Sequence, residues 1–467
     1  MLHLVDKILN LAEKQADYAE VRYEKLDKNK IILKNSNLEV VEFGVTEGIC
    51  IRVLLNGALA TSYICEGKFE KAKAAVENAV KSAKASARIL KKKIGFSKET
   101  PYKDNYEVKE KIKLKNVSIE EKIKEVVNID KEIMSTKLKI PARFFDLSDA
   151  VREKLYMNSE GARIHSIIPR INFEYLLTFV GKNSEQRMYQ FSASGGWEIF
   201  KNWDLKKKLL EEAKLLAKIS KAPKAPAGKM DLLVSPDIAG IVAHESTGHP
   251  YEADRILGRE AAQAGESFVT ANMGGTRIGS DVVNLIDDPT IPHSFGFYLY
   301  DDEGVKAQKR LLIKNGIINS FLHNRETAFE FGIKSNAAAR ANHWNAEPIV
   351  RMANTFFMPG DHSFEELVEE IKKGIYIKSY MEWNIDDKRY NQRYGGLECY
   401  KILNGRICGL VRRPILEITT PAFYNSVDAC GKDLDFSAGT CGKGDPMQAI
   451  PVWFGGPHIR LRNVFIK

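Results

Sequence analysis

Residues 235–254, SPDIAGIVAHESTGHPYEAD, carry two histidines that enclose a glutamate. His244, Glu245 and His249 form the pattern H-E-x-x-x-H. The zinc-binding motif H-E-x-x-H separates its histidines by four positions, which places both on one face of a helix. By composition, the longer pattern should arise by chance in about one chain of this kind in a hundred. The pattern therefore indicates a metal site, although its histidines lie five positions apart.

The local sequence offers a way to direct both imidazoles to one ion. Positions four apart lie about 40° apart around a helix, whereas positions five apart lie about 140° apart. A regular helix, capped by Ser235, therefore cannot aim both side chains at one metal. Gly248 tolerates unusual backbone angles, and the residue before Pro250 is disfavoured in the α region. A π-bulge would also insert the extra residue. We expect the helix to bulge or break before His249.

A catalytic zinc ion takes three protein ligands and keeps one position for water, so a third ligand is required. Cys441 lies in the glycine-rich stretch SAGTCGKGD, residues 437–445. Glycines there allow close backbone approach or tight turns, which suits a ligand loop. From the residues alone, Cys430 is a nearly equal candidate, and the carboxylates Glu252 and Asp254 remain possible.

The composition is that of an ordinary globular protein, with 44% hydrophobic and 28% charged residues among 467. No apolar run is long enough to span a bilayer. The first residues show helical spacing interrupted by charges and lack the apolar core of a signal peptide, which predicts a cytoplasmic protein with no membrane partner. The six cysteines are scattered, which argues against a disulfide scaffold.

The net charge of +9 raises the possibility of a nucleic-acid partner. The basic residues do not concentrate, however, and the runs at 91–93 and 206–208 are short. No helix-turn-helix, zinc-finger or RNA-recognition signature is present. A mildly basic solvated surface is favoured over a nucleic-acid-binding one.

Hydrophobic periodicity predicts an α+β fold. Strand-like segments fill residues 18–64 and an amphipathic helix residues 67–90. A second α+β unit begins with a capping box at Ser118 and Glu121 and ends with a helix over 204–219. The predicted sections are an N-terminal α+β domain (1–92), a linker or exposed excursion (93–116), a middle α+β domain (117–220), a linker (221–229) and a C-terminal domain (230–467).

The C-terminal section is predicted to be rich in antiparallel sheet, with the metal-bearing helix near its start. Asn315-Gly316 and Asn404-Gly405 each separate two β-rich runs, which is typical of tight hairpins. Residues 363–374 predict a helix that is capped by Ser363 and ends at Gly374. The segment Asp301 to Glu303 is interpreted as a turn closed by glycine rather than as a second cation site.

Several segments resemble the TldD/PmbA (TldD/TldE) family of zinc-dependent peptidases. HESTGHPYEAD is similar to the metal motif of the TldD subunit. YDDEGVKAQKRLLIKNGIINSFL (300–322), VRMANTFFMPGD (350–361) and GTCGKGD (439–445) resemble further blocks of the family, in the same order. Together they cover most of residues 230–460, and the N-terminal half is similar more loosely.

This resemblance implies the roles of four residues. His244, His249 and Cys441 would bind Zn²⁺, and Glu245 would be the catalytic base that takes a proton from water activated by zinc. A His/His/Cys set favours zinc over other divalent ions. At 246–247 and 250–251 the chain departs from the smaller or more apolar residues common in the family.

The resemblance also implies a substrate and a partner. The substrate would be unfolded or flexible peptides, and the partner a homologous PmbA/TldE-type subunit without the metal motif, or a second copy. Because this chain keeps the motif, it resembles the active TldD-type subunit. The alternatives are a non-catalytic scaffold or regulatory subunit, and a nucleic-acid or gyrase-associated modulator. Arg351 and Asn354 could hold substrate or the metal loop, or could be structural.

Overall fold

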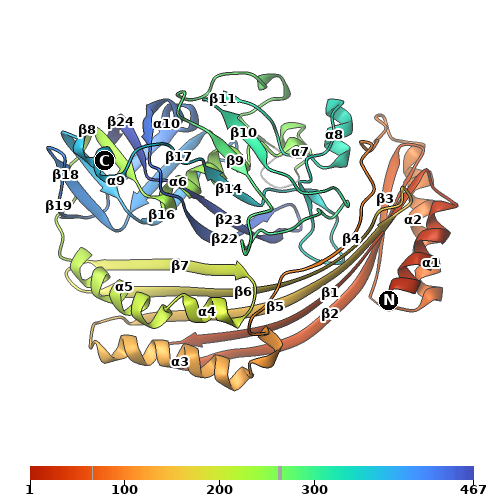
Figure 1. Ribbon diagram of the computed structural model, residues 1–467, viewed down its shortest axis with the longest axis horizontal. Coiled ribbons are helices and arrows are strands. Elements are labelled where there is room, and N and C mark those ends of the chain that lie inside the picture. Colours follow the sequence, from red (N-terminus) through yellow and green to blue (C-terminus); the bar gives the residue numbers. More distant parts are fainter. Residues whose placement is uncertain (66, 261–265) are drawn as a thin grey trace.

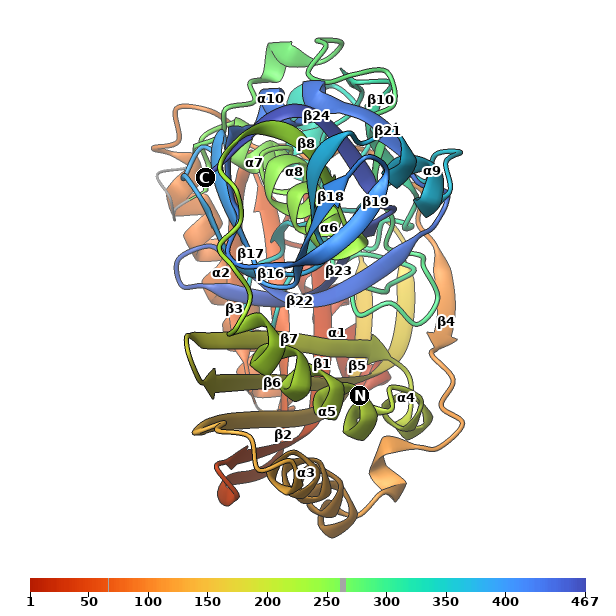
Figure 2. The same ribbon diagram turned by 90° about the vertical axis from the view of Figure 1, so that its left-hand side faces the viewer.

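The chain has an α+β fold, as the sequence predicts. The computed structural model describes residues 1–65, 67–260 and 266–467. The strands in these residues form sheets of seven, nine, six and two strands. The seven-stranded sheet comes from the first half of the chain, and it curves beneath the C-terminal section (Figure 1). Figure 2 shows the same two layers from the side, with the C-terminal section above the sheet.

The seven-stranded sheet joins the two α+β units of the N-terminal half. β1 pairs antiparallel with β2 on one side and with β5 on the other. β4, within the stretch expected to be a linker, pairs in parallel with β6. The boundaries given above for the sections stay a prediction. The strands are β1 (Tyr18–Lys34), β2 (Asn37–Leu55), β3 (Ala58–Ile64), β4 (Lys103–Glu107), β5 (Ala142–Asn158), β6 (Arg163–Val180) and β7 (Ser184–Ser194).

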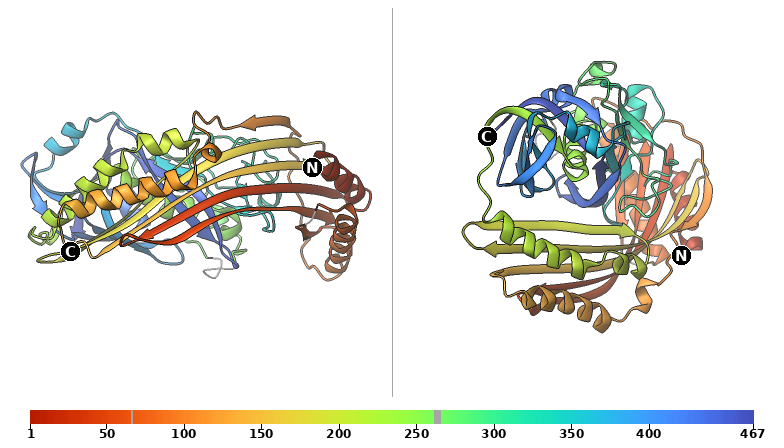
Figure 3. Two further views of the ribbon diagram at one scale, coloured as in Figure 1. Left: turned by 90° about the horizontal axis from the view of Figure 1, so that it is seen from below. Right: turned by 60° about the vertical axis from the view of Figure 1, so that its left-hand side comes forward.

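Helices cover this sheet near its two ends, as Figures 1 and 3 show. At one end α1 and α2 bury a stripe of apolar side chains against β1, β2 and β3. At the other end α3, α4 and α5 cover β5, β6 and β7. Ser118 caps α3 by accepting a hydrogen bond from the backbone N–H of Glu121, as predicted. The helices are α1 (Leu2–Glu13), α2 (Phe69–Ala87), α3 (Ile119–Ser135), α4 (Trp197–Asn202) and α5 (Leu205–Ile219).

The C-terminal section contains two larger sheets. The first, in spatial order, is β16 (Tyr380–Ile385), β17 (Asn391–Gly396), β20 (Ile415–Thr419), β24 (Ile459–Ile466), β8 (Gly228–Val234), β15 (Lys373–Ile377), β18 (Cys399–Leu403) and β19 (Arg406–Val411), with β21 (Val427–Cys430) beside β24. The second is β11 (Ile317–Ile318), β10 (Arg310–Lys314), β9 (Leu285–Asp287), β14 (Asn354–Phe357), β23 (Gln448–Gly456) and β22 (Asp435–Lys443).

Short elements complete this section. β12 (Ala339–Arg340) pairs with β13 (Ile349–Val350). The helices are α6 (Pro236–Ala243), α7 (Ala253–Ile256), α8 (Arg325–Phe331), α9 (Phe364–Glu369) and α10 (Thr420–Ser426). None of the helices in the described part of the chain is long and apolar enough to cross a membrane.

Both predicted hairpins are confirmed. Asn315 and Gly316 separate β10 from β11 and have φ angles of 48° and 72°. Asn404 and Gly405 separate β18 from β19 with φ angles of 46° and 73°. Positive φ at both central residues is the reason that Asn-Gly is favoured in such turns.

The predicted helix over 363–374 is too long. Its start is right, because Ser363 and Glu366 form a full capping box. α9 nevertheless ends at Glu369, and Gly374 belongs to β15, where it pairs with Asp231 of β8. A Cβ on Gly374 would lie 2.6 Å from the carbonyl oxygen of Asp231. The glycine therefore permits a close strand contact and does not end the helix.

Candidate metal centre

One histidine of the motif begins a single π-turn and the other directly follows it. α6 ends at Ala243, and residues His244–Gly248 form a π-helical turn. The backbone N–H of His249 donates to the carbonyl oxygen of His244 at 3.1 Å, a bond across five positions. The expected distortion is confirmed, and it is a bulge rather than a break, since His249 keeps helical backbone angles before Pro250. One added residue per turn brings both side chains to the same side.

Gly248 is required by packing. Its backbone is not left-handed, but a Cβ at this position would lie 2.5 Å from Sδ of Met352 and 3.3 Å from Oγ1 of Thr355. The π-turn therefore packs directly onto β14 and the residues just before it. The glycine anticipated as a source of backbone freedom acts instead by its small size.

His244, His249 and Cys441 meet in one buried cluster. One ligand atom from each lies within 4.8 Å of those of the other two. Sγ of Cys441 is 3.2 Å from Nε2 of His249, and the two imidazole rings stand at 86° with centroids 5.0 Å apart. Cys441 comes from β22, far along the chain from α6. Cys430 lies elsewhere, with its Sγ near the carbonyl oxygen of Val282.

The donor set of this cluster fits a zinc ion. Burial raises the pKa of the Cys441 thiol, but the two histidines and Arg351 outweigh burial and hold this pKa well below its usual value. Burial lowers the pKa of His249 to about 3, whereas burial of His244 is outweighed by the charge of Cys441, which raises the pKa of His244. Nδ1 of His244 is buried and has no hydrogen-bond partner in the described residues. A thiolate and imidazole nitrogens are donors that zinc prefers, and the metal displaces the proton of an imidazole that it binds.

A network of charged side chains connects two of these residues. Nδ1 of His249 lies 3.2 Å from Oε2 of Glu252. Arg351 donates from Nη2 to the carbonyl oxygen of Cys441 at 2.6 Å, and its Nε lies 3.8 Å from Glu252. Lys443 places its Nζ 3.2 Å from the same carboxylate. Glu252 and Arg351 therefore hold His249 and Cys441 in position. A carboxylate that is hydrogen-bonded to a metal-binding histidine commonly has this role.

Lys443 lies in the stretch GTCGKGD, and its role was not predicted from the sequence. Residues two apart on a strand point to the same face, so Lys443 shares a face with Cys441 on β22. That spacing is the signal that could have identified it. Its ammonium group donates to Asp254 at 2.6 Å and to the carbonyl oxygen of Val350 at 2.8 Å.

Asn354 and the acidic segment lie in structural positions. The side chain of Asn354 donates to the carbonyl oxygen of Asp288 and to Oγ of Ser294. Asp301 accepts hydrogen bonds from the backbone N–H groups of Glu303 and Val305 around a glycine with a φ of 75°. The turn at residues 301–304 is therefore the one predicted from the sequence.

Glu245 points its carboxylate into a cleft beside the cluster. It accepts hydrogen bonds from Nε1 of Trp383 at 3.2 Å and from Nη1 of Arg389 at 2.5 Å. Burial raises the pKa of this carboxyl, but Arg389 and the two histidines outweigh burial and hold the pKa below its usual range. Glu245 is therefore ionised. Trp383 lies in β16 and Arg389 in the connection from β16 to β17. Neither was anticipated, because no sequence pattern shows that this hairpin packs against Glu245.

The cleft measures about 360 Å³ and lies between the seven-stranded sheet, hereafter the long sheet, and the C-terminal section. One wall carries the cluster and Glu245, and the other carries Tyr189 and Gln190 of β7. Gln190 donates to Oγ1 of Thr440 at 3.2 Å, which ties β7 to the edge strand β22. The cluster is thus buried at the wall of an open cleft.

Comparison with known proteins gives matches along the whole chain. Three family models match: PmbA/TldA metallopeptidase domain 1 over residues 19–87, the central domain over 112–221 and the C-terminal domain over 227–467. A metalloprotease of Methanocaldococcus jannaschii is 35% identical over 463 residues, which are 98% of each chain. A zinc metalloprotease TldD homolog of Saccharolobus solfataricus is 26% identical over 455 residues, 96% of each chain.

A solved structure shares the fold. The crystal structure of TldE from Thermococcus kodakarensis superimposes with a TM-score of 0.74 at 17% sequence identity. It covers 99% of both chains. The arrangement of the long sheet and the C-terminal section is therefore that of a known fold.

Proposed function

Because the chain belongs to the PmbA/TldA metallopeptidase family and is a metalloprotease, we propose that it uses zinc to hydrolyse unfolded or flexible peptides. His244, His249 and Cys441 would hold the ion. The observation that carries this proposal is the π-turn, which brings both histidines beside Cys441 at the wall of the cleft. The zinc metalloprotease among the relatives supports the choice of metal.

In this proposal Glu245 is the general base. When bound, zinc supplies a Lewis acid that polarises the scissile carbonyl and makes water more acidic. Glu245 accepts the proton of the attacking water and returns it to the leaving amine. Arg389 and Trp383 hold the carboxylate ionised and oriented toward the cleft. Glu252 and Arg351 keep His249 and Cys441 in place.

The shape of the cleft supports flexible peptides as substrates. A cavity of about 360 Å³ between two sheets admits a few residues of extended chain but not a folded domain. Its lining includes the aromatic side chains of Tyr189, Tyr380, Trp383 and Phe454. These rings offer apolar contact area to side chains of many kinds.

The proposal includes a homologous partner subunit or a second copy, with this chain as the TldD-type active subunit. β3 pairs with residues 49–55 of β2 only, so residues 37–48 of β2 lie at the edge of the sheet in the described structure. Leu38, Val41, Phe43 and Val45 are exposed along this edge, Phe43 by 74%. Exposed apolar edge strands commonly pair with another chain. The cytoplasmic location expected from the sequence also belongs to this proposal.

Metal analysis together with peptidase assays tests the proposed function. The wild type should contain one zinc ion per chain and cleave a denatured protein substrate. Glu245→Ala should keep the zinc and lose at least about a hundredfold in kcat, since general-base groups contribute about 10²- to 10⁴-fold. A wild type that binds no metal would sink the proposal, and full activity in Glu245→Ala would refute the role of the base.

A further inference from the structure

A second, smaller cavity of about 50 Å³ lies between the long sheet and the C-terminal section. Its charged lining is mainly basic, with Asp301 and Asp302 as the acidic members. The basic residues come from β1, β5, β6 and β12, so both halves of the chain contribute. They are Arg22, Arg152, Lys154, Arg170 and Arg340.

Three of these arginines have no carboxylate partner within 4 Å in the described residues: Arg22, Arg170 and Arg340. Their hydrogen bonds go to backbone carbonyl oxygens, which are those of His343 and Ala346 for Arg22, Phe295 and Phe297 for Arg170, and Met352 and Pro451 for Arg340. Despite burial, Asp302, Glu24 and Glu20 balance the charge of Arg22 and raise its pKa. A buried cation without a counter-ion is costly, so Arg170 and Arg340 call for an anion.

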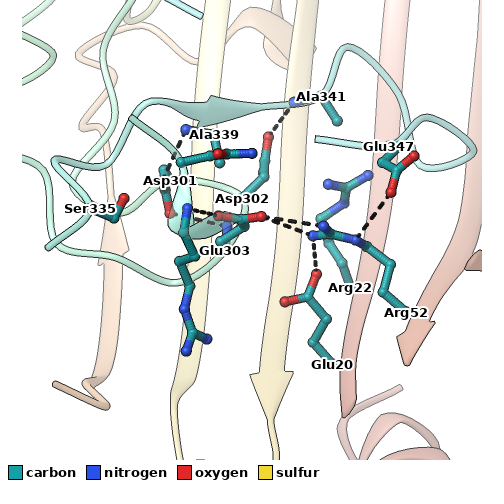
Figure 4. Close-up of polar contacts among 12 residues, drawn as sticks. Glu20, Arg22, Arg52, Asp301, Asp302, Glu303, Ser335, Ala339, Ala341 and Glu347 are labelled. Carbon is teal, nitrogen blue, oxygen red and sulfur yellow. Dashed lines mark hydrogen bonds and ion pairs between the residues drawn. The ribbon is translucent and has the colours of Figure 1, made fainter. Parts of the chain in front are cut away.

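The nearby carboxylates lie against other partners than Arg170 and Arg340. Glu24 lies 3.7 Å from Arg152 and 3.9 Å from Lys154, and Figure 4 shows Asp302 beside the backbone of Ala341 and Glu303 beside Arg52. Asp302 accepts from Lys154 at 2.6 Å and from the backbone N–H of Ala341 at 2.7 Å. Glu303 accepts from Arg52. Burial accordingly lowers the pKa of Arg170 to about 9 and that of Arg340 to about 10.

We propose that this cavity binds an oxyanion, a carboxylate or phosphate group held by the guanidiniums of Arg170 and Arg340. Guanidinium groups match both oxyanions with paired N–H donors. Ser166 and Tyr106 also line the cavity and can add hydroxyl donors. The anion has two possible sources: a free ion such as phosphate, or the carboxylate of a bound peptide.

A further groove has lining residues in common with both this cavity and the metal cleft. It shares Thr440 with the cleft and Arg152, Arg170 and Pro451 with the basic cavity. In the β22–β23 pair Thr440 lies opposite Pro451. A peptide that leaves the metal cleft along this groove would bring its terminal carboxylate to the arginines. This source of the anion rests on the proposed peptidase function, whereas binding of a free oxyanion does not.

The first experiment measures thermal unfolding of the metal-loaded full chain in phosphate and in chloride at equal ionic strength. The wild type should show a saturable rise of Tm with phosphate. Arg170→Gln and Arg340→Gln should each weaken the apparent phosphate affinity about tenfold or more, because each removes a charged donor. Arg143→Gln is the matched control: Arg143 of β5 is about as buried as Arg340, but it is paired with Asp130 outside the cavity. It should keep the full phosphate response.

The second experiment compares hydrolysis of one peptide with a free C-terminal carboxylate and with an amidated C-terminus. If the peptide supplies the anion, amidation should raise KM about tenfold in the wild type, and Arg170→Gln should abolish this difference. The control Arg143→Gln should preserve it.

The two experiments separate the possible outcomes. A phosphate response that the cavity variants lose supports a free oxyanion, and a KM difference that they lose supports a substrate carboxylate. If phosphate has no effect and amidation leaves KM unchanged, the proposal is overturned. An absence of peptidase activity with a normal phosphate response would refute the peptidase proposal but not the oxyanion site. If one cavity variant does not fold, the other serves in its place.

Discussion

At the scale of single residues, Arg351 and Glu252 hold two of the proposed metal ligands in position. Arg351 contacts the backbone of Cys441 and lies beside Glu252, which is bonded to His249. A single guanidinium thus links two ligands that come from different elements. Their relative position depends on this link, because β22 and the π-turn are far apart in the chain.

Replacing Arg351 should therefore weaken metal binding. Arg351→Met removes both contacts and should lower zinc affinity about 10- to 100-fold, the usual effect of losing an outer-shell partner. Competition with a chromophoric chelator measures this affinity. The control is Arg310→Met, since Arg310 is a buried arginine of β10 that pairs with Asp287. It should lower stability without changing zinc affinity, and equal affinities in wild type and Arg351→Met would contradict the prediction.

His323 should make stability depend on pH. Burial lowers the pKa of this histidine to about 4, whereas an unfolded histidine has a pKa of about 6.5. Between these values the unfolded chain binds more protons, so this contribution to stability is full above pH 6.5 and is lost as the pH falls toward 4. The loss approaches roughly 3 kcal/mol.

Urea unfolding at pH 7 and pH 5 tests this prediction. His323→Gln removes the titrating group and should lose less stability than the wild type over this interval. Its hydrogen bond to Thr327 is a separate contribution that affects both pH values alike. Equal losses in the two proteins would show that His323 is not the cause.

At the scale of elements, the π-turn depends on close packing at Gly248. Gly248→Ala would place a Cβ 2.5 Å from Met352, which is fully buried and has little room to move. Overpacking of this kind costs about 1–3 kcal/mol and should also displace His249, the next residue. We expect lower Tm and weaker zinc binding, measured by calorimetry and metal titration.

Gly409→Ala is the matched control for this change. A Cβ at Gly409 would meet nothing within 4 Å, and the residue lies in β19. This variant should be close to neutral. If Gly248→Ala behaves in the same way, the π-turn does not need the glycine.

Turns, helix caps and the bulge could be predicted from the sequence because neighbouring residues determine them. Asn-Gly turns and the caps at Ser118 and Ser363 depend on neighbouring residues, and the bulge near His249 followed from the spacing of the histidines. Gly374 was misassigned because its strand partner lies more than a hundred residues away. Arg389 was missed for the same kind of reason, since contacts between distant segments leave no local pattern.

At the scale of the whole molecule, buried ion pairs join the long sheet to the C-terminal section. Arg52 of β2 contacts both Glu20 of β1 and Glu303 of the C-terminal section. Lys154 of β5 pairs with Asp302. The metal cleft lies between the same two layers, so these contacts help to set its width.

Removing one partner of such a pair should destabilise the whole chain. Asp302→Asn leaves Lys154 without its closest carboxylate and should cost about 3 kcal/mol, as is usual when a buried pair is broken. Chemical unfolding measures the loss. Asp281→Asn changes an exposed carboxylate paired with Arg277 and should cost less than about 0.5 kcal/mol. Equal effects of the two changes would mean that the layers do not depend on the Asp302 pair.

The most direct measurement is an anomalous difference map recorded at the zinc edge from crystals of the metal-loaded protein. We expect one strong peak bonded to Sγ of Cys441 at about 2.3 Å and to one nitrogen of each of His244 and His249 at about 2.0–2.1 Å. A peak held by Cys430 or by Glu252 in place of Cys441, or no peak between the two histidines, would contradict the proposed centre.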